Sequence, residues 1–548
     1  MLGRRHAWLV LAACVTLLAV AQSAQAASPG CSPRTLVHTK SGPVCGLTAK
    51  GQTSYLDIRY AAPPVGALRW MPPQPARRWK STYRATRRGR GCAQPSYPTS
   101  GLQAGTGEDC LFLEVQEPAK IKAGTRLPVM VELHGGGFLG EYRDDDGTNL
   151  VKSGPAIYVY VGYRLGILGF LAESALGGHS GDFGLMDQQA ALRWVKRNIA
   201  AFGGNAHDVT IFGESAGGAS VCDQLASPTA KGLFEHGISI SGFYNFNVNT
   251  IWSQADCKSR LQTESQAQQA GATFAQSVGC GTASDVAACL RAVPTATLVE
   301  KAGTYLAPTA GGSIGPIANG TTLPMSPAQA FARGKVNKVG LMIGVGEDEF
   351  NGGVYTNGTT TVVANTLAQY QTLVRQQFGS NAAKVMRLYP PTRYPSPSPF
   401  IAYRAIMADA FSVCPALTSF GELAKHIPVY AYQDDDTDSP SEGGNQPLGA
   451  YHSAINRLVH DPPKSLDPNQ LMLQTQVLDE WSAFARTGNP TGPGTPLWSR
   501  YTAPGHPVMA LIPAGDSMLT PTSAIAAEHH CGFWDALDRN AQWSVHAG

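Results

Sequence analysis

One stretch decides the fold of this chain: Phe212-Gly213-Glu214-Ser215-Ala216-Gly217-Gly218. The short apolar run 209–213 predicts a buried strand, and a helical pattern begins at Ala216. Gly-x-Ser-x-Gly in a sharp strand-to-helix turn is a nucleophile elbow, in which glycines let the turn close and the serine hydroxyl stands clear of the sheet. The N-terminus of the helix also favours negative charge that develops there. We therefore predict that Ser215 is a nucleophile.

A glycine turn upstream of the serine fits the same chemistry. His134-Gly135-Gly136-Gly137-Phe138 follows the strand-like run 129–133. Residues without side chains let backbone N–H groups converge on one point, where they stabilise the oxyanion of a tetrahedral intermediate. The N–H of the residue after the nucleophile, Ala216, joins them. Alone, the turn would be an ordinary glycine loop, but between a strand and an elbow it predicts an oxyanion hole.

Carboxylates and a histidine follow Ser215 along the chain. Enzymes with a nucleophile elbow carry their catalytic residues in this order: serine, acid, histidine. The strand-like run 339–345 ends just before Gly346-Glu347-Asp348-Glu349. A carboxylate past the C-terminal end of a strand lies at the edge where such sites open. Another strand-like run, 428–432, is followed by His452 in a polar loop. The residues alone leave open which of the three carboxylates faces the histidine.

The alternation of strands and helices predicts an α/β fold, with a mostly parallel central sheet flanked by helices. Short apolar runs that predict strands lie at 129–133, 157–163, 209–213, 237–241, 339–345 and 428–432. Between them, one helical face carries Leu185, Gln188, Leu192, Val195 and Ile199, which indicates packing against the sheet. We expect one domain over 27–548, because the pieces of a single site span Gly136 to His452 and no linker or repeat divides them.

The chain resembles the type-B carboxylesterases, the α/β-hydrolase family that includes carboxylesterases, cholinesterases and some lipases. Ordered matching motifs run almost end to end: Tyr60-Ala61-Ala62-Pro63-Pro64-Val65-Gly66, Glu108-Asp109-Cys110-Leu111-Phe112-Leu113, Tyr163-Arg164-Leu165-Gly166, Phe202-Gly203-Gly204-Asn205 and Phe484-Ala485-Arg486-Thr487-Gly488-Asn489-Pro490. The resemblance implies that Ser215 is the nucleophile, Glu349 the acid and His452 the base. It also implies that Gly136, Gly137 and Ala216 are the oxyanion donors. The chain departs from the family at Phe350, where a glycine usually follows the acid.

The first 26 residues read as a signal peptide. Arg4 and Arg5 give a positive start, an apolar run covers 7–21, and Ala24-Gln25-Ala26 is a small-x-small cleavage site. The apolar run is shorter than the roughly 20 residues that a membrane span needs. We therefore expect an exported protein, periplasmic or secreted, without stable membrane insertion.

Cysteine usage supports export. Of eleven cysteines, Cys14 lies in the predicted signal peptide, and the remaining even number suits an oxidising compartment. The resemblance suggests the pairs Cys92–Cys110 and Cys280–Cys289, with Cys414–Cys531 tying down the C-terminal tail, and Cys31–Cys45 is expected because these two are close in sequence and otherwise unclaimed. For Cys222 and Cys257, a bond and two buried free thiols are equally favoured.

Charge and composition point to a small-molecule ester substrate rather than a large anionic partner. The net charge of +3 falls to +1 once Arg4 and Arg5 leave with the signal peptide, so nothing suggests nucleic acid or an anionic membrane surface. No Cys-x-x-Cys and no His-x-x-x-His cluster occurs, which argues against a metal site. The implied chemistry requires no cofactor, and the sequence leaves the oligomeric state unknown.

Three alternatives to a general carboxylesterase remain. A non-catalytic adhesion-type relative would lack the nucleophile, whereas this chain keeps Ser215. A lipase needs a large apolar pocket and usually a lid, but the loop between Cys92 and Cys110 has only Tyr97 and Leu102 as large apolar residues. A cholinesterase needs an aromatic cage, and this loop has no tryptophan. Smaller, soluble esters are therefore favoured.

Overall fold

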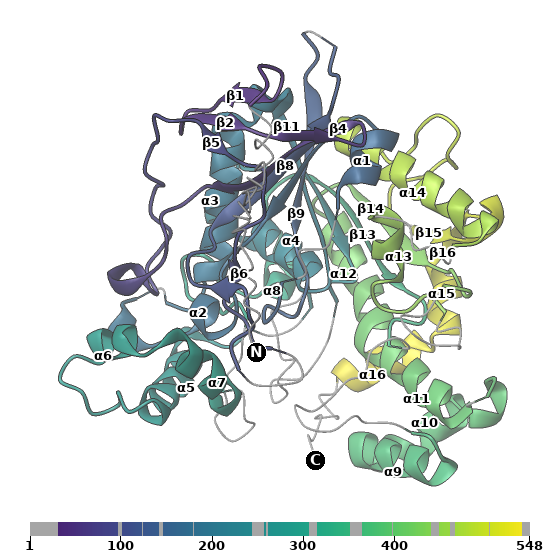
Figure 1. The fold of residues 1–548 in the computed structure, drawn as a ribbon. Helices are drawn as coiled ribbons and strands as arrows, with labels where there is room; N and C mark the ends of the chain where they lie inside the picture. The colour runs from purple at the N-terminus through teal and green to yellow at the C-terminus, as the bar shows by residue number, and fades with distance from the viewer. Residues whose placement is uncertain are drawn as a thin grey trace, which may run out of the picture.

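A twisted sheet runs through the middle of the protein in the computed structural model (Figure 1). In the described part of the chain it has eleven strands, in the order β16-β15-β14-β13-β12-β11-β9-β10-β8-β4-β3. The strands from β15 to β10 run parallel, and antiparallel strands flank them at both edges. The predicted α/β fold with a mostly parallel sheet is therefore confirmed. The strands are β3 (Leu47–Ala49), β4 (Gln52–Arg59), β8 (Phe112–Pro118), β9 (Leu127–Leu133), β10 (Ile157–Val161), β11 (Gly204–Glu214), β12 (His236–Ile240), β13 (Gly340–Gly346), β14 (Val429–Asp434), β15 (Pro507–Leu511) and β16 (Met518–Pro521).

The structure describes residues 31–96, 101–122, 124–141, 146–178, 180–243, 257–258, 261–305, 315–350, 364–396, 398–439, 449–460, 466–502 and 505–539, with the backbone alone for 303–305, 538 and 539. The predicted signal peptide, 1–26, lies outside these residues, as does Tyr97 of the loop between Cys92 and Cys110. The signal peptide therefore stays a prediction, and the surroundings of Tyr97 are not described.

Helices cover both faces of the sheet (Figure 1). Helices α3 (Phe183–Asn198) and α4 (Ala216–Ala226) pack on one face, and α1 (Thr148–Ser153), α13 (Ala454–Val459) and α14 (Pro468–Thr487) on the other. Alternate residues of β9 serve the two faces: Val129 and Val131 join the first core and Met130 the second. Burial on both faces explains why the central strands are continuous apolar runs.

The observed strands match the predicted runs, with shifted ends. The largest shift is in β11, which begins at Gly204 because this residue pairs with Leu127 of β9 before the register shifts ahead of Val209. Strand β10 ends at Val161, two residues early, and Gly162 N–H donates instead to the carbonyl of Phe112. Each strand still delivers its C-terminal end to the same edge of the sheet, and that edge carries the predicted site residues.

A long apolar helix lies inside the protein beside this edge. Helix α11 (Ser398–Ala408), the π-helical turn η7 (Asp409–Val413) and α12 (Cys414–Ala424) form one stretch of 27 residues that is long and apolar enough to cross a membrane. Most of it is buried among other elements of the described chain, as expected of a core helix.

Disulfides close loops in the described chain, with sequence separations from 9 to 117 residues. The bonded pairs are Cys31–Cys45, Cys92–Cys110, Cys222–Cys257, Cys280–Cys289 and Cys414–Cys531. Four are the pairs expected from the sequence, and Cys222–Cys257 is the pair that the sequence left open. The last bond holds α16 (Cys531–Arg539) against α12, where Trp534 is buried and its Nε1 donates to the Tyr389 hydroxyl at 2.7 Å.

Candidate active site

Ser215 occupies a strained turn between β11 and α4. Its backbone has φ 58° and ψ −123°, a left-handed region that L-residues rarely adopt. A Cβ at Gly213 would lie 2.3 Å from the carbonyl oxygen of Leu133, and one at Gly217 would lie 1.9 Å from the same oxygen. Any larger residue at either position would collide with β9, so the tight turn requires both glycines.

The glycine turn at 134–138 lies directly against this elbow. Gly136 and Gly137 have φ 99° and 63°, and a Cβ built on Gly135 would lie 3.3 Å from Ser215 Cβ. The N–H groups of Gly136, Gly137 and Ala216 donate no hydrogen bond to another described residue. The predicted oxyanion donors are therefore available beside the candidate nucleophile.

An acid and a histidine meet at the same edge of the sheet. His452 Nδ1 lies 2.5 Å from Glu349 Oε1, and the two backbones are joined by an N–H···O bond of 2.9 Å from His452 to Glu349. The other carboxylate oxygen, Oε2, accepts from Ser241 Oγ at 3.0 Å and from Gly346 N–H at 2.7 Å. Glu349 is fully buried and held at both oxygens, so it can fix the orientation of the imidazole.

The neighbouring carboxylates are less buried than Glu349. Glu347 and Asp348 are half-buried just past β13. Burial, together with the negative charges of Asp348 and Asp435, raises the pKa of Glu347 to about 8. Of the three carboxylates that the sequence left open, the structure places Glu349 against His452.

A second carboxylate, which the sequence reasoning missed, faces the other imidazole nitrogen. Glu214 Oε1 lies 3.0 Å from His452 Nε2 and accepts a hydrogen bond of 2.6 Å from the Ser453 hydroxyl. Ser453 itself has a left-handed backbone, φ 72°. An ionised carboxylate is an acceptor only, so an arrangement with a carboxylate at each ring nitrogen favours the doubly protonated, cationic form of the His452 imidazole.

The charge around His452 explains how strongly it holds its proton. Burial lowers the pKa of this imidazole, but the charges and hydrogen bonds of Glu214 and Glu349 outweigh burial and raise it to about 10. A raised pKa means that the imidazolium persists at pH values where an ordinary histidine is neutral. The group must lose the Nε2 proton before it can act as a base.

The other histidines near this part of the chain have separate partners. His460 Nε2 lies 3.3 Å from Glu132, and His529 Nδ1 lies 2.6 Å from Asp409. Both pairs are buried. His460 and His529 are therefore each paired with a carboxylate other than Glu349 and Glu214.

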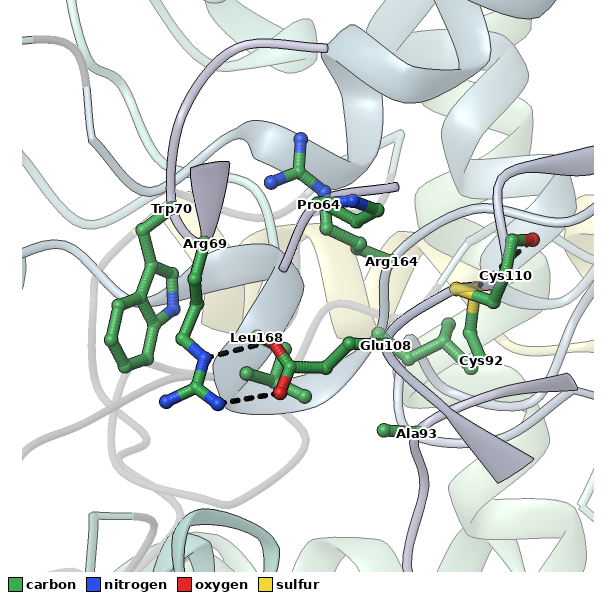
Figure 2. Close-up of a pocket in the computed structure, with 10 residues that line it drawn as sticks. Pro64, Arg69, Trp70, Cys92, Ala93, Glu108, Cys110, Arg164 and Leu168 are labelled. Atoms are coloured by element: carbon green, nitrogen blue, oxygen red, sulfur yellow. Dashed lines mark hydrogen bonds and ion pairs between the residues drawn. A yellow bond between two sulfur atoms is a disulfide. The ribbon is translucent and has the colours of Figure 1, made fainter. Parts of the chain in front are cut away.

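A small cavity lies beside the Cys92–Cys110 disulfide, away from these residues (Figure 2). It has room for about one water molecule. Figure 2 shows Arg69 at its wall, paired with Glu108. Its lining includes none of Ser215, Glu349 and His452, so we regard it as a gap in packing and not as the substrate site.

Comparison with known proteins shows the family to which this chain belongs. The sequence model of the carboxylesterase family matches residues 33–534. The chain belongs to the carboxylesterase family. It is similar to the para-nitrobenzyl esterase of Bacillus subtilis (32% identity over 83% of this chain and 90% of that protein), to a cocaine esterase of Oryctolagus cuniculus (30% identity; 85% and 88%) and to a cholinesterase of Mus musculus (29% identity; 91% and 86%). This carboxylesterase is therefore a carboxylic-ester hydrolase acting on small-molecule esters.

The carboxylesterase carries three polar residues at the site that sequence reasoning had not assigned: Glu214, Ser241 and Ser453. Ser241 is the last residue of the predicted strand 237–241 and lies just past the observed end of β12, at the same edge as Glu349, so the rule that found the acid could also have found it. Glu214 lies within the elbow motif, but the motif itself gives this position no role. Nothing in the sequence signals Ser453, because its contact spans 239 residues.

Proposed function

We propose that this carboxylesterase hydrolyses its substrates through an acyl-enzyme formed on Ser215. Neutral His452 takes the proton of the Ser215 hydroxyl at Nε2 while Oγ attacks the ester carbonyl carbon. The oxyanion that forms accepts from the N–H groups of Gly136, Gly137 and Ala216. His452 then gives its proton to the leaving alcohol, and water hydrolyses the acyl-enzyme by the same route.

The observation that best supports this proposal is that the candidate catalytic groups meet at one edge of the sheet. A buried carboxylate held at both oxygens lies 2.5 Å from the imidazole, and the strained serine and the glycine turn end at the same edge. A merely structural Glu349–His452 pair would not require a serine held in a left-handed turn. A fluorophosphonate probe for serine hydrolases should label the protein at Ser215, whereas an unlabelled protein would favour a non-catalytic, adhesion-type relative.

We expect this enzyme to prefer short-chain, soluble esters to long-chain lipid esters. The loop between Cys92 and Cys110 is poor in large apolar residues, which a lipase lid would need. A panel of p-nitrophenyl esters from acetate to palmitate should show kcat/KM falling as the acyl chain lengthens. Highest activity on palmitate, or a rise in activity at the surface of lipid droplets, would instead support the lipase alternative.

Glu214 should set the pH at which His452 becomes a base. Replacing Glu214 with Gln removes a negative charge 3.0 Å from Nε2, so the imidazolium loses a stabilising partner and its pKa falls. An opposite charge at this distance typically shifts a pKa by about 1–3 units. The acid limb of the pH profile of kcat/KM, which reports the free enzyme, should therefore move to lower pH by a similar amount.

Two further variants sharpen this measurement. Ser453→Gly tolerates the left-handed backbone but removes the hydrogen bond to Glu214, so it should shift the limb in the same direction by less. Glu422→Gln, which removes a half-buried carboxylate paired with Lys425 on α12, should leave the limb in place. An unchanged profile in Glu214→Gln would show that Glu214 does not control His452.

We also propose that the enzyme is exported and works outside the reducing cytoplasm. The signal-like N-terminus and the disulfides support this localisation. Non-reducing peptide mapping of the exported protein should find all five bonds, including Cys222–Cys257. Closing a loop of about 15 residues contributes roughly 3 kcal/mol, so reduction should also lower Tm. Free thiols at Cys92 and Cys110 would contradict both the bonds and the localisation.

A further inference from the structure

One part of the chain is far more basic than the whole. Between Ile58 and Gly107 the sequence has nine arginines and lysines and no aspartate or glutamate, so this tenth of the chain carries more positive charge than the net +3 of the complete chain. Seven of the nine fall within residues 77–90, a segment that we call the basic strap. Its basic residues are Arg77, Arg78, Lys80, Arg84, Arg87, Arg88 and Arg90.

The basic strap is fixed to the body by its apolar residues. It contributes β5 (Tyr83–Arg84) to a small sheet with β1 (Leu36–His38) and β2 (Pro43–Cys45), seen at the upper left of Figure 1. Trp79 donates from its backbone N–H to Ser41 and from Nε1 to the Pro43 carbonyl, both at 2.9 Å. The Tyr83 hydroxyl donates to the Asp57 carbonyl at 2.8 Å, and Ala85 is fully buried. These anchors make the strap a fixed part of the surface.

The charged side chains of the strap face solvent, and most lack a counter-charge. All seven residues are exposed. Arg88 has Glu114 at 3.1 Å. Within the described residues no carboxylate lies within ion-pair distance of the other six, Arg77, Arg78, Lys80, Arg84, Arg87 and Arg90. By contrast, Arg59 and Arg69, just outside the strap, are both paired with carboxylates (Figure 2 shows Arg69).

Six like charges on a fixed segment repel one another and do not stabilise the fold, so an external anion is the natural partner. We propose that the basic strap binds an acidic polysaccharide, a polymer with carboxylate or sulfate groups repeated along its chain. Five of the six unpaired residues are arginines, whose planar guanidinium matches such groups with two parallel hydrogen bonds. The strap spans at most about 45 Å, which suits a repeating polymer rather than one small anion.

The side chains of the strap favour a polysaccharide over other polyanions. Single-stranded nucleic acid is usually bound with aromatic rings that stack on bases, but Trp79 and Tyr83 are half-buried and pack against each other, with ring centroids 5.6 Å apart and an interplanar angle of 46°. Binding in a membrane interface needs exposed apolar side chains, and residues 77–90 expose no large hydrophobic one. The strap therefore offers charge without an apolar or stacking surface.

Binding can be tested with the purified full chain on immobilised polygalacturonate (carboxylate) and dextran sulfate (sulfate), with neutral dextran as the blank. Wild-type protein should bind at least one of the charged polymers at about 0.1 M NaCl and elute as salt screens the charges. The variants Arg77→Gln/Arg78→Gln/Lys80→Gln and Arg84→Gln/Arg87→Gln/Arg90→Gln should each weaken binding by about tenfold or more. A matched control, Arg333→Gln/Lys335→Gln/Lys384→Gln, removes three exposed basic residues elsewhere and should bind like the wild type.

Hydrolysis of p-nitrophenyl acetate should be the same in all these proteins, because the strap belongs to the small three-stranded sheet, whereas Ser215 and Glu349 follow strands of the large sheet. The two polymers separate carboxylate from sulfate recognition. Failure of the wild type to bind either one would overturn the proposal, as would equal loss in the control variant. Tighter binding to duplex DNA, or to phosphatidylserine vesicles, at the same salt concentration would overturn it in favour of a nucleic acid or a membrane.

Discussion

Ser215→Ala should abolish ester hydrolysis while the protein still folds and is exported. Removing the nucleophile of a serine hydrolase lowers kcat by roughly 10⁶-fold, and what remains comes from the oxyanion hole and substrate binding. Alanine keeps the Cβ of serine, so it experiences the same strain at φ 58° and should change stability little. The measurements are kcat on p-nitrophenyl acetate and Tm by circular dichroism.

Two further variants make this result specific. Ser277→Ala, on the exposed surface of α5 (Glu264–Ser277), should keep full activity. Ser215→Gly should be equally inactive but no less stable, because glycine adopts the left-handed backbone without strain. Retention of more than a small fraction of wild-type turnover in Ser215→Ala would show that another residue is the nucleophile.

Glu349→Gln should be the most damaging change among the three neighbouring carboxylates. Replacing the acid of a triad by its amide lowers kcat by about 10⁴-fold in the best-known case, because the imidazole is then held in the wrong tautomer. Glu347→Gln and Asp348→Asn should lose much less, because both residues are only half-buried and the structure places Glu349 at Nδ1 of His452. The comparison needs kcat/KM for the three variants, with Tm to show that each is folded.

The pattern of losses decides the assignment. Comparable losses in Asp348→Asn and Glu349→Gln would mean that the acid is shared or misplaced. If Glu347→Gln alone were inactive, the register of the loop after β13 would be wrong. Ser241→Ala offers an independent check, because it removes one hydrogen bond from Glu349 Oε2 and should lower activity by a smaller factor than Glu349→Gln.

The sequence by itself determined the fold and the kinds of residue at the site. Two sequence features were enough to predict the fold. The first is the set of continuous apolar runs, which a sheet buried on both faces requires. The second is the pair of glycines at 213 and 217, because any side chain there would collide with the carbonyl oxygen of Leu133. Local geometry dictates these features, so they are visible within a few residues. The order of serine, acid and histidine could be read for the same reason, since each follows a strand-like run.

Only the tertiary structure decided which groups touch. The contact of His452 with Glu349 spans 103 residues, that of Ser241 with Glu349 spans 108, and that of Ser453 with Glu214 spans 239. No local pattern records such contacts, because they depend on the parallel strands that bring their C-terminal ends to one edge of the sheet. The choice of Glu349 over its neighbours and the second carboxylate on the imidazole follow from that convergence. The Cys222–Cys257 bond, which spans 35 residues, is also decided by the tertiary structure.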